Sequence, residues 1–308
     1  MGDLNDAPLN RPNQLRIAYV LVAHQRPESI IRLVRRLYAP DHAFLIHYDL
    51  RSSETNLRRI IDEFKGVSNV RFLKRFKCSW GDIGIVRAAF DGLRELAEMN
   101  FPYDYAIHLS GQDYPIKSDA QIREWLAAAA GASFLEATAW PIPNWEKGRA
   151  IKRLENYHVH LPVPPWARSL GWQPGWQHLT IPMKRKIPGG LHPYFGSAFW
   201  YLHRGCQKVL HEYLVQHPEL VSFYAHALLP EESIVQTVLM NSALASTVVP
   251  RTLTYVDWRP PWPGILTVAD LPKLKQSDCL LARKFSPATD AQVLDQLDLL
   301  LAASGGQI

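Results

Sequence analysis

Two pairs of charged side chains have the types and spacing needed for group-transfer chemistry. Glu231 and Glu232 follow Pro230 at the start of an expected helix, and Arg283 and Lys284 end a short apolar segment. A carboxylate can take the proton from an attacking hydroxyl, and neighbouring cations can hold phosphate oxygens directly. Composition alone leaves a structural alternative for each pair. Carboxylates in a first helical turn favour the helix dipole, and an Arg–Lys pair is also found as an exposed helix cap or surface ion pair.

Two aspartates and two histidines lie near the ends of apolar segments. Asp49 and Asp113 each follow such a segment, where an isolated aspartate is as often a helix N-cap as a ligand-binding residue. His24 and His47 could be ligands or bases, but a packed, hydrogen-bonded histidine is the more common finding at a strand end. These residues are therefore candidates that only a wider pattern can decide.

Several common binding motifs are absent from the chain. It contains no G-x-G-x-x-G after the first expected strand, no G-x-x-x-x-G-K-[ST], no G-x-S-x-G and no H-E-x-x-H. It also has no Asp-x-Asp, the usual metal-binding pair of nucleotide-sugar transferases with an alternating α/β sheet. A diphosphate substrate would need another source of positive charge, which Arg283 and Lys284 could supply.

Hydrophobic periodicity predicts the elements that position these residues. Strands are expected at 16–22, 43–48, 70–73 and 105–109, and helices at 27–37, 55–64, 83–99 and 120–130. This alternation predicts an α/β fold, with a mostly parallel sheet covered by helices on both faces. Ligands of such sheets bind at the carboxyl ends of the strands. The chemistry should therefore lie in the loops that carry His24, Asp49, Trp80 and Asp113.

The second half of the chain is less regular. Residues 141–192 are rich in Trp, Pro, His and Arg, and we interpret them as acceptor-binding loops with one or two helices rather than a separate domain. Beyond them we expect strands at 196–202, 251–258 and 280–285 and helices to about 216, at 230–239 and at 288–303. The predicted organisation is a flexible start (1–15) and a single domain (16–305), with acceptor-side loops at about 140–195.

Composition limits the partners and the compartment. The formal net charge of +5 suits nucleic acid, anionic lipid or a phosphorylated small molecule, but the densest basic cluster is only Met183-Lys184-Arg185-Lys186. We expect no nucleic-acid partner, while peripheral attachment to an anionic membrane is compatible with the charge. Three cysteines without a C-x-x-C pair favour a reducing compartment. With no signal-peptide pattern and no apolar run of ~18 residues, we expect a cytoplasmic protein, at most attached to the inner face of the membrane.

Seven segments occur in the order and over the span found in one known family. They are 19–24, 44–49, 79–81, 108–117, 196–200, 229–233 and 282–285, of which S-G-Q-D-Y-P-I-K and A-R-K-F are the most specific in combination. On these segments the sequence resembles the core-2/I-branching β-1,6-N-acetylglucosaminyltransferases and the peptide O-xylosyltransferases, which form one glycosyltransferase family. The Trp- and Pro-rich middle of the chain is matched poorly.

The resemblance implies a GT-A fold, a UDP-sugar donor, inversion at the anomeric carbon, and neither a metal nor another cofactor. Glu232 matches the family's general base, Asp49 its uridine-side aspartate and Asp113 the acid near the donor sugar. Arg283 and Lys284 match the basic residues that replace the metal at the diphosphate.

Further site residues follow less directly from the same resemblance. Arg259 is the nearest candidate for an additional arginine on the diphosphate. We also expect His24 and Trp80 on the donor side and Trp200 and Glu231 on the acceptor side.

The donor sugar is left open by the sequence. Ala198 stands where the xylosyltransferases carry an acid, as in the N-acetylglucosaminyl branch, whereas 229–233 and 282–285 look closer to the xylosyltransferases. The expected donors are therefore UDP-xylose or UDP-N-acetylglucosamine, with UDP-glucuronate a third choice. The expected acceptor is a hydroxyl of a glycan or glycoconjugate, in bacterial polysaccharide or glycoconjugate synthesis. The alternatives are a metal-dependent retaining transferase, a sugar-nucleotide hydrolase, and a catalytically inactive module that binds a glycan or nucleotide sugar.

Overall fold

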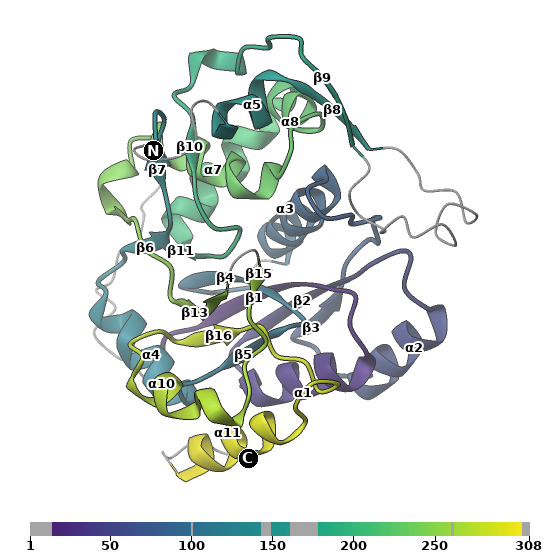
Figure 1. Cartoon of the computed structure of the whole chain (residues 1–308). Coiled ribbons are helices and arrows are strands. Elements are labelled where there is room, and N and C mark those ends of the chain that lie inside the picture. The colour runs from purple at the N-terminus through teal and green to yellow at the C-terminus, as the bar shows by residue number, and fades with distance from the viewer. Residues whose placement is uncertain (1–13, 100, 143–148, 161–177, 260–261, 304–308) are drawn as a thin grey trace, which may run out of the picture.

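A seven-stranded sheet forms the centre of the computed structural model, which describes residues 14–99, 101–142, 149–160, 178–259 and 262–303 (Figure 1). The strand order is β12-β6-β11-β4-β1-β2-β3. The bounds are β1 Ile17–Ala23, β2 Ala43–Tyr48, β3 Val70–Phe72, β4 Tyr105–Ser110, β6 Ser133–Leu135, β11 Trp200–His203 and β12 Val248–Val249. Only β11 runs antiparallel to its neighbours β4 and β6, so the predicted α/β fold with a mostly parallel sheet is confirmed.

Helices cover both faces of this sheet. On one side lie α1 Pro27–Leu37, α2 Glu54–Glu63, α4 Asp119–Ala128, α10 Leu271–Gln276 and α11 Gln292–Ala303. On the other lie α3 Ile83–Glu98, α5 Arg149–Glu155, α7 Arg204–Gln216, α8 Pro218–Tyr224 and α9 Ile234–Met240. Side chains alternate along a strand, so β1 contributes to the hydrophobic cores on both faces of the sheet. Tyr19 and Leu21 lie in the core on the α1 side, and Ala18 and Val20 lie in the core on the α3 side. The continuous apolar run of β1 therefore reflects burial on both faces.

Smaller sheets and single helical turns stand beside the main sheet. The small strands are β5 Asp113–Pro115, β7 Thr138–Ala139, β8 Tyr157–His160, β9 His178–Ile181, β10 Tyr194–Phe195, β13 Thr254–Val256, β14 Trp258–Arg259, β15 Trp262–Pro263 and β16 Leu281–Arg283. The 3-10 turns are η2 Pro188–Gly190, η3 Pro230–Glu232, η4 Ala245–Thr247 and η5 Val268–Asp270. In the three-stranded sheet β13-β16-β5, Arg283 is paired with Asp113 across β16 and β5.

Three expectations about local structure were wrong. The expected strand 196–202 begins only at Trp200, because residues 196–198 are hydrogen-bonded outside the sheet, to Glu232, Gln236 and His108. The expected helix 230–239 is instead η3 followed by α9. The break falls at Ser233, whose φ of −146° is not helical.

The predicted flexible start is also too long at its end. Leu15 is buried in the core, and its carbonyl oxygen accepts a hydrogen bond from Arg123 Nη1 at 2.6 Å. Of the expected acceptor-side loops at 140–195, residues 143–148 and 161–177 lie outside the described residues, and the described part contains α5 and the β8–β9 hairpin.

Candidate active site

The carboxyl ends of β1, β2 and β4 bring the first group of predicted residues together. These strands are parallel neighbours, so His24 after β1, Asp49 after β2 and the 110–113 turn after β4 lie at one edge of the sheet. The turn and the loop after β1 approach so closely that a Cβ atom on Gly111 would lie 2.2 Å from Gln25 Oε1. A side chain at this position would therefore displace the amide end of Gln25.

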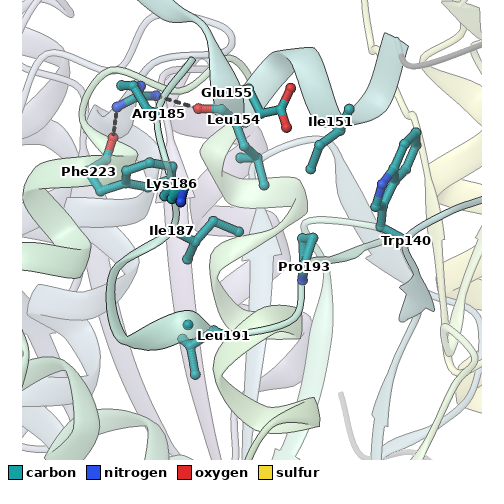
Figure 2. A pocket seen from close by; sticks show the side chains of 11 residues that line it. Trp140, Ile151, Leu154, Glu155, Arg185, Lys186, Ile187, Leu191, Pro193 and Phe223 are labelled. Carbon is teal, nitrogen blue, oxygen red and sulfur yellow. Dashed lines mark hydrogen bonds between the residues drawn. The ribbon is translucent and has the colours of Figure 1, made fainter.

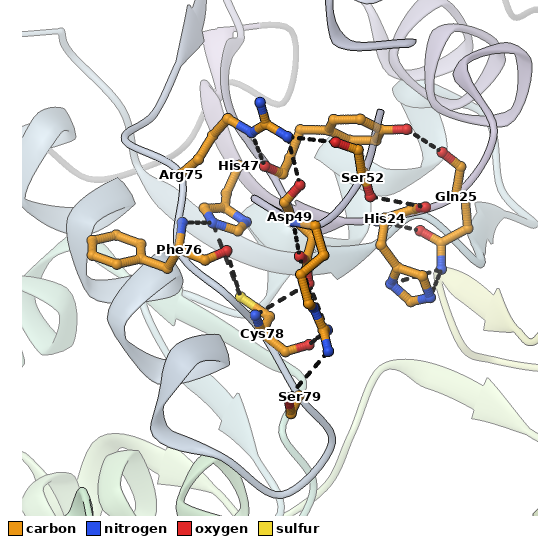
Figure 3. A network of polar contacts seen from close by, with 11 residues as sticks. His24, Gln25, His47, Asp49, Ser52, Arg75, Phe76, Cys78 and Ser79 are labelled. Carbon is orange, nitrogen blue, oxygen red and sulfur yellow. Dashed lines mark hydrogen bonds and ion pairs between the residues drawn. The ribbon is translucent and has the colours of Figure 1, made fainter. Parts of the chain in front are cut away.

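Asp49 is a buried anion that joins two loops (Figure 3). Its carboxylate accepts hydrogen bonds from the backbone N–H of Arg51 at 2.7 Å and of Cys78 at 3.1 Å. The Arg51 side chain donates to the same carboxylate through Nε at 3.1 Å and Nη2 at 2.9 Å. Burial acts to raise the pKa of Asp49, but the Arg51 guanidinium and these N–H groups hold that pKa below its usual value. Asp49 is thus fixed as a carboxylate whose oxygens are already engaged.

Arg51 is a residue of this edge that the sequence analysis did not single out. Its side chain is 52% exposed and also donates to Ser79 Oγ at 3.2 Å. The adjacent Trp80 is exposed, and its ring meets the Trp262 ring edge-on at 6.2 Å. The surface at this edge therefore offers a guanidinium and an indole, with Asp49 behind them. The spacing of Arg51 two residues after Asp49 was the available signal.

The two histidines differ in role. His24 is exposed at this edge, with the Gln25 amide nitrogen 3.4–3.5 Å from its ring nitrogens. His47 is buried, and its Nε2 accepts a hydrogen bond from the Phe76 N–H at 2.8 Å. Burial lowers the pKa of His47 to about 4, so the ring is neutral. His47 is therefore a packed, hydrogen-bonded histidine, whereas His24 remains a candidate for the donor side.

A second group surrounds Arg283. The buried Asp113 accepts a hydrogen bond from Arg283 Nε at 2.9 Å, and the guanidinium lies 4.0 Å over the Phe199 ring. The Arg283 side chain is only 15% exposed, which rules out the exposed surface pair considered above for this residue. Burial acts to raise the pKa of Asp113, and Arg283 opposes that shift.

Lys284 differs from Arg283 in having no ion pair within the described part of the chain. Partial burial, followed by the neighbouring charge of Arg283, lowers the pKa of its ammonium. The next residue, Phe285, donates its N–H to the Gln112 carbonyl at 2.9 Å, which ties this strand end to the turn after β4. Of the two cations, Lys284 is the one whose charge is not already paired.

The two adjacent glutamates of η3 lie in different environments. The Glu232 side chain is 37% exposed, and its Oε2 accepts a hydrogen bond from Arg153 Nη1 at 2.8 Å. Glu231 is buried, and its Oε2 has no hydrogen-bond partner. Burial and the adjacent Glu232 raise the pKa of Glu231 to about 8, which makes it a neutral carboxylic acid at neutral pH. Only Glu232 presents a carboxylate that an incoming molecule can reach.

The segment 196–199 connects Glu232 with Arg283. At one end the Gly196 N–H donates to the Glu232 carbonyl at 2.9 Å, and at the other the Phe199 ring lies under the guanidinium. Three residue steps span at most about 11 Å, so this segment brings the Glu232 backbone close to the Phe199–Arg283 contact. The donor-side loop joins the same region, because the Leu229 N–H donates to the Gly81 carbonyl at 3.2 Å.

Comparison with known proteins decides the family. The model of the Core-2/I-Branching enzyme family matches residues 17–279. The chain belongs to this family. Among curated relatives, xylosyltransferase 1 of Rattus norvegicus is 28% identical over 315 residues, which cover 94% of this chain and 36% of the relative. Human xylosyltransferase 2 is 29% identical, over 96% of this chain and 35% of the relative. The chain spans about a third of the length of these relatives.

Two solved structures share a distant resemblance with the chain. Residues 1–349 of S. aureus TarS in complex with UDP-GlcNAc give a TM-score of 0.27 at 10% identity, over 47% of this chain and 40% of that one. A 4-diphosphocytidyl-2C-methyl-D-erythritol synthase from Anaerococcus prevotii gives 0.33 at 10% identity, over 67% of this chain and 77% of that one.

Two residues expected at the acceptor side of this family member lie inside the protein. Trp200 is 2% exposed and stacks on His108 at 5.2 Å. It starts β11, which lies between β4 and β6, so its indole faces the helix layer and cannot contact an acceptor. Glu231 is likewise buried, away from solvent. The burial of both side chains argues against their assignment to the acceptor side, because sequence pattern does not show which way a residue at a strand end or in a turn faces.

Arg259 lies on the β14–β15 hairpin. Its guanidinium forms ion pairs with Asp257 at 2.6 Å and with Asp270 at 3.3 Å. A Cβ atom on Gly264 would lie 2.7 Å from its Nε, so the side chain lies across that glycine. A contact of Arg259 with a diphosphate stays a prediction.

The described residues contain neither a metal cluster nor a membrane-spanning helix. Within them, no cluster of three or more His, Cys, Asp or Glu side chains could hold a metal ion. Across the same ranges, no helix is both long enough and apolar enough to cross a membrane.

Proposed function

We propose that the chain transfers a sugar from a UDP-sugar to a hydroxyl group, with inversion and without a metal ion. The observation that carries this proposal is the segment 196–199, which contacts the Glu232 backbone at one end and the Arg283 guanidinium at the other, while the Glu232 carboxylate is open to solvent. A base on one side and fixed positive charge on the other is the arrangement that a single displacement requires. Membership of the Core-2/I-branching family and the xylosyltransferase names of the relatives support it.

In this mechanism Glu232 takes the proton of the acceptor hydroxyl. The acceptor oxygen forms a bond to the anomeric carbon, and the bond from that carbon to the UDP oxygen breaks on the opposite face, so the configuration inverts. The electron pair of the broken bond leaves with UDP. Arg283 and Lys284 stabilise the charge that grows on the diphosphate, which is where fixed cations lower the barrier most.

Arg153 has a defined part in this arrangement. It pairs with Oε2 of Glu232, while Oε1 has no hydrogen bond to a described residue and is left for the acceptor. Burial acts to raise the pKa of Glu232, and the Arg153 charge opposes that shift. Arg153 therefore helps to keep the base ionised.

For the donor we propose UDP-xylose or UDP-N-acetylglucosamine, with the nucleotide at the edge formed by His24, Arg51 and Trp80. Exposed aromatic rings and a guanidinium suit a base and a ribose. The acceptor is proposed to be a hydroxyl of a glycan or glycoconjugate in bacterial glycan synthesis.

One screen tests donor and metal together. The protein is incubated with UDP-xylose, UDP-N-acetylglucosamine or UDP-glucuronate in EDTA, and release of UDP is measured with and without glycan acceptors. We expect turnover of one donor in EDTA and a product of inverted anomeric configuration by NMR. Activity that disappears in EDTA and returns with Mn²⁺ or Mg²⁺ would show that a metal carries the leaving-group charge. Binding of UDP without turnover of any donor would instead indicate an inactive binding module.

A further inference from the structure

A second concave site lies beside α5 (Figure 2). It is an open cavity of about 360 Å³. Its apolar lining residues are Trp140, Ile151, Leu154, Ile187, Leu191, Pro193 and Phe223, and its charged lining residues are Glu155, Arg185 and Lys186. The volume lies within the usual range of sites for small organic ligands, about 300–1,000 Å³. None of these residues belongs to the site described above.

The walls favour an apolar occupant over a bare sugar. Most of the lining is aliphatic or aromatic, and a sugar buried there would leave several hydroxyl groups without hydrogen-bond partners. An alkyl or aryl group carries no such cost, and its transfer from water onto this surface is favourable.

The charges of the cavity favour an anionic group next to that apolar part. Arg185 has no carboxylate partner among the described residues. Its guanidinium donates instead to four backbone carbonyl oxygens at 2.7–3.0 Å, those of Phe223, Leu154, Asn156 and His226. Lys186 is exposed at the cavity and is not paired with any described acid. Two cations against the single carboxylate of Glu155 leave a net positive charge, which attracts a phosphate or carboxylate.

The cavity is one helix away from the proposed base. Ile151 and Leu154 line the cavity, whereas Arg153 reaches Glu232 at 2.8 Å. With 3.6 residues per turn, Arg153 points to the opposite face of α5, so the helix itself stands between the cavity and the Glu232 carboxylate. The segment from Pro193 through β10 to Gly196 connects the two sites without crossing α5. Pro193 lines the cavity, the Gly196 N–H donates to the Glu232 carbonyl, and three residue steps span at most about 11 Å.

We propose that this cavity binds the apolar aglycone of the acceptor, with an anionic group of that acceptor beside Lys186. The acceptor is then an amphiphilic glycoconjugate, in which a sugar hydroxyl lies at Glu232 and a phosphodiester, which keeps one negative charge, joins the sugar to a short alkyl or aryl group about 10 Å away. This inference rests on the proposed function, because it takes Glu232 as the base.

Binding at the cavity is tested with octyl phosphate as the probe, by calorimetry on the whole protein. Inorganic phosphate, which lacks the alkyl chain, and octyltrimethylammonium, which carries the opposite charge, serve as comparisons. We expect octyl phosphate to bind and neither comparison to bind at the same concentration. Lys186→Glu should weaken octyl phosphate binding roughly tenfold, as expected for loss of a charge-assisted contact. Lys184→Glu makes the same charge change outside the cavity and should leave binding unchanged.

A filling variant provides an independent check. Leu191→Trp places a larger ring in the cavity and should abolish binding, whereas Leu179→Trp, on the exposed face of β9, should not. Thermal unfolding shows whether each variant is folded. Equal effects of the two lysine variants, or full binding by a folded Leu191→Trp protein, would overturn the cavity as the site.

Its role in the acceptor site is tested by inhibition. Octyl phosphate should compete with the acceptor, not with the UDP-sugar, and UDP affinity should be unchanged in Leu191→Trp and Lys186→Glu. Binding that does not compete with the acceptor overturns the assignment as an acceptor subsite. Failure of the proposed function would give a different result. The unaltered protein would then turn over none of the UDP-sugars, while calorimetry could still detect binding of octyl phosphate in the cavity.

Discussion

At the scale of single residues, burial separates side chains that look alike in the sequence. Glu231 and Glu232 are adjacent, yet one is an inward, neutral acid and the other a reachable carboxylate paired with Arg153. Arg283 and Lys284 are adjacent as well, and only Arg283 is paired with Asp113. The consequences of changing one member of each pair should therefore differ sharply.

For the first pair, Glu232→Gln keeps the size of the side chain but removes the proton acceptor. We expect kcat to fall roughly 10²–10⁴-fold, the usual range for loss of a general base, with little change in UDP affinity. Glu231→Gln should retain most of the activity, because its carboxyl does not face the substrate region. Steady-state kinetics with the donor found in the screen make the comparison, and the reverse ranking would mean that Glu231 is the base.

For the second pair, Lys284→Ala should weaken UDP binding roughly ten- to a hundredfold, because a charge-assisted contact contributes about 1.5–3 kcal/mol. kcat should fall too, since the leaving diphosphate gains charge in the transition state. Arg283→Ala should have these effects and also lower Tm, because it leaves Asp113 buried without its cation. Calorimetry with UDP and thermal unfolding measure both. Unchanged UDP affinity in the folded double variant would remove the proposed clamp.

At the scale of elements, short connections bring distant parts of the chain to one site. The segment 196–199 leaves the sheet before β11 and links η3 with Arg283. The helix α5 serves two surfaces, because its Arg153 faces Glu232 and its Ile151 and Leu154 face the cavity. Arg153 on α5 and the bond from Gly196 thus set the ionisation and the position of the base.

Removal of the Arg153 charge should change how the activity depends on pH. The pKa of Glu232 is raised by burial and by the negative charge of Glu136, and it is lowered by Arg153. In Arg153→Met the lowering influence is lost, so the pKa of Glu232 rises and the base is protonated up to a higher pH. The acid limb of the kcat–pH profile should therefore move to higher pH.

Arg153→Lys, which keeps the charge, should show a smaller displacement of that limb. A purely structural role of Arg153 predicts loss of activity with the acid limb unmoved, and that result would contradict the assignment.

At the scale of the whole molecule, the site lowers stability in a pH-dependent way. The pKa of Glu231 is raised to about 8 in the folded protein, whereas an unfolded chain releases this proton near the ordinary pKa of a glutamate. The folded state therefore binds more protons between these two values, and stability is lost as the pH rises through this window.

The corresponding experiment compares Tm of the unaltered protein and Glu231→Gln between pH 5 and pH 8. A raised pKa costs about 1.4 kcal/mol per unit, so the variant should be the more stable protein at pH 8, with little difference at pH 5. If Tm of both proteins fell in parallel across this range, Glu231 would not be the acid that causes the loss of stability.

The sequence by itself determined the alternating strands and helices, because the apolar periodicity of residues 16–130 reflects burial on one or both faces. It also determined the family, through motifs that stand at strand ends. It could not determine the direction of side chains in turns and irregular segments. The same holds at strand ends: Trp200, the first residue of β11, was assigned to the acceptor side but packs on His108, and Arg51 was overlooked although it covers Asp49.

Only the tertiary structure decided which partners those side chains meet. Arg283 and Asp113 are 170 residues apart in the sequence and Arg153 and Glu232 are 79 apart, yet each pair is within hydrogen-bond distance. The cavity beside α5 likewise combines residues from 140 to 223. Periodicity records whether a residue is buried, but ion pairs and cavities arise where separate elements pack together. Their geometry, and with it the ionisation of Glu231 and Glu232, is therefore a property of the packed fold.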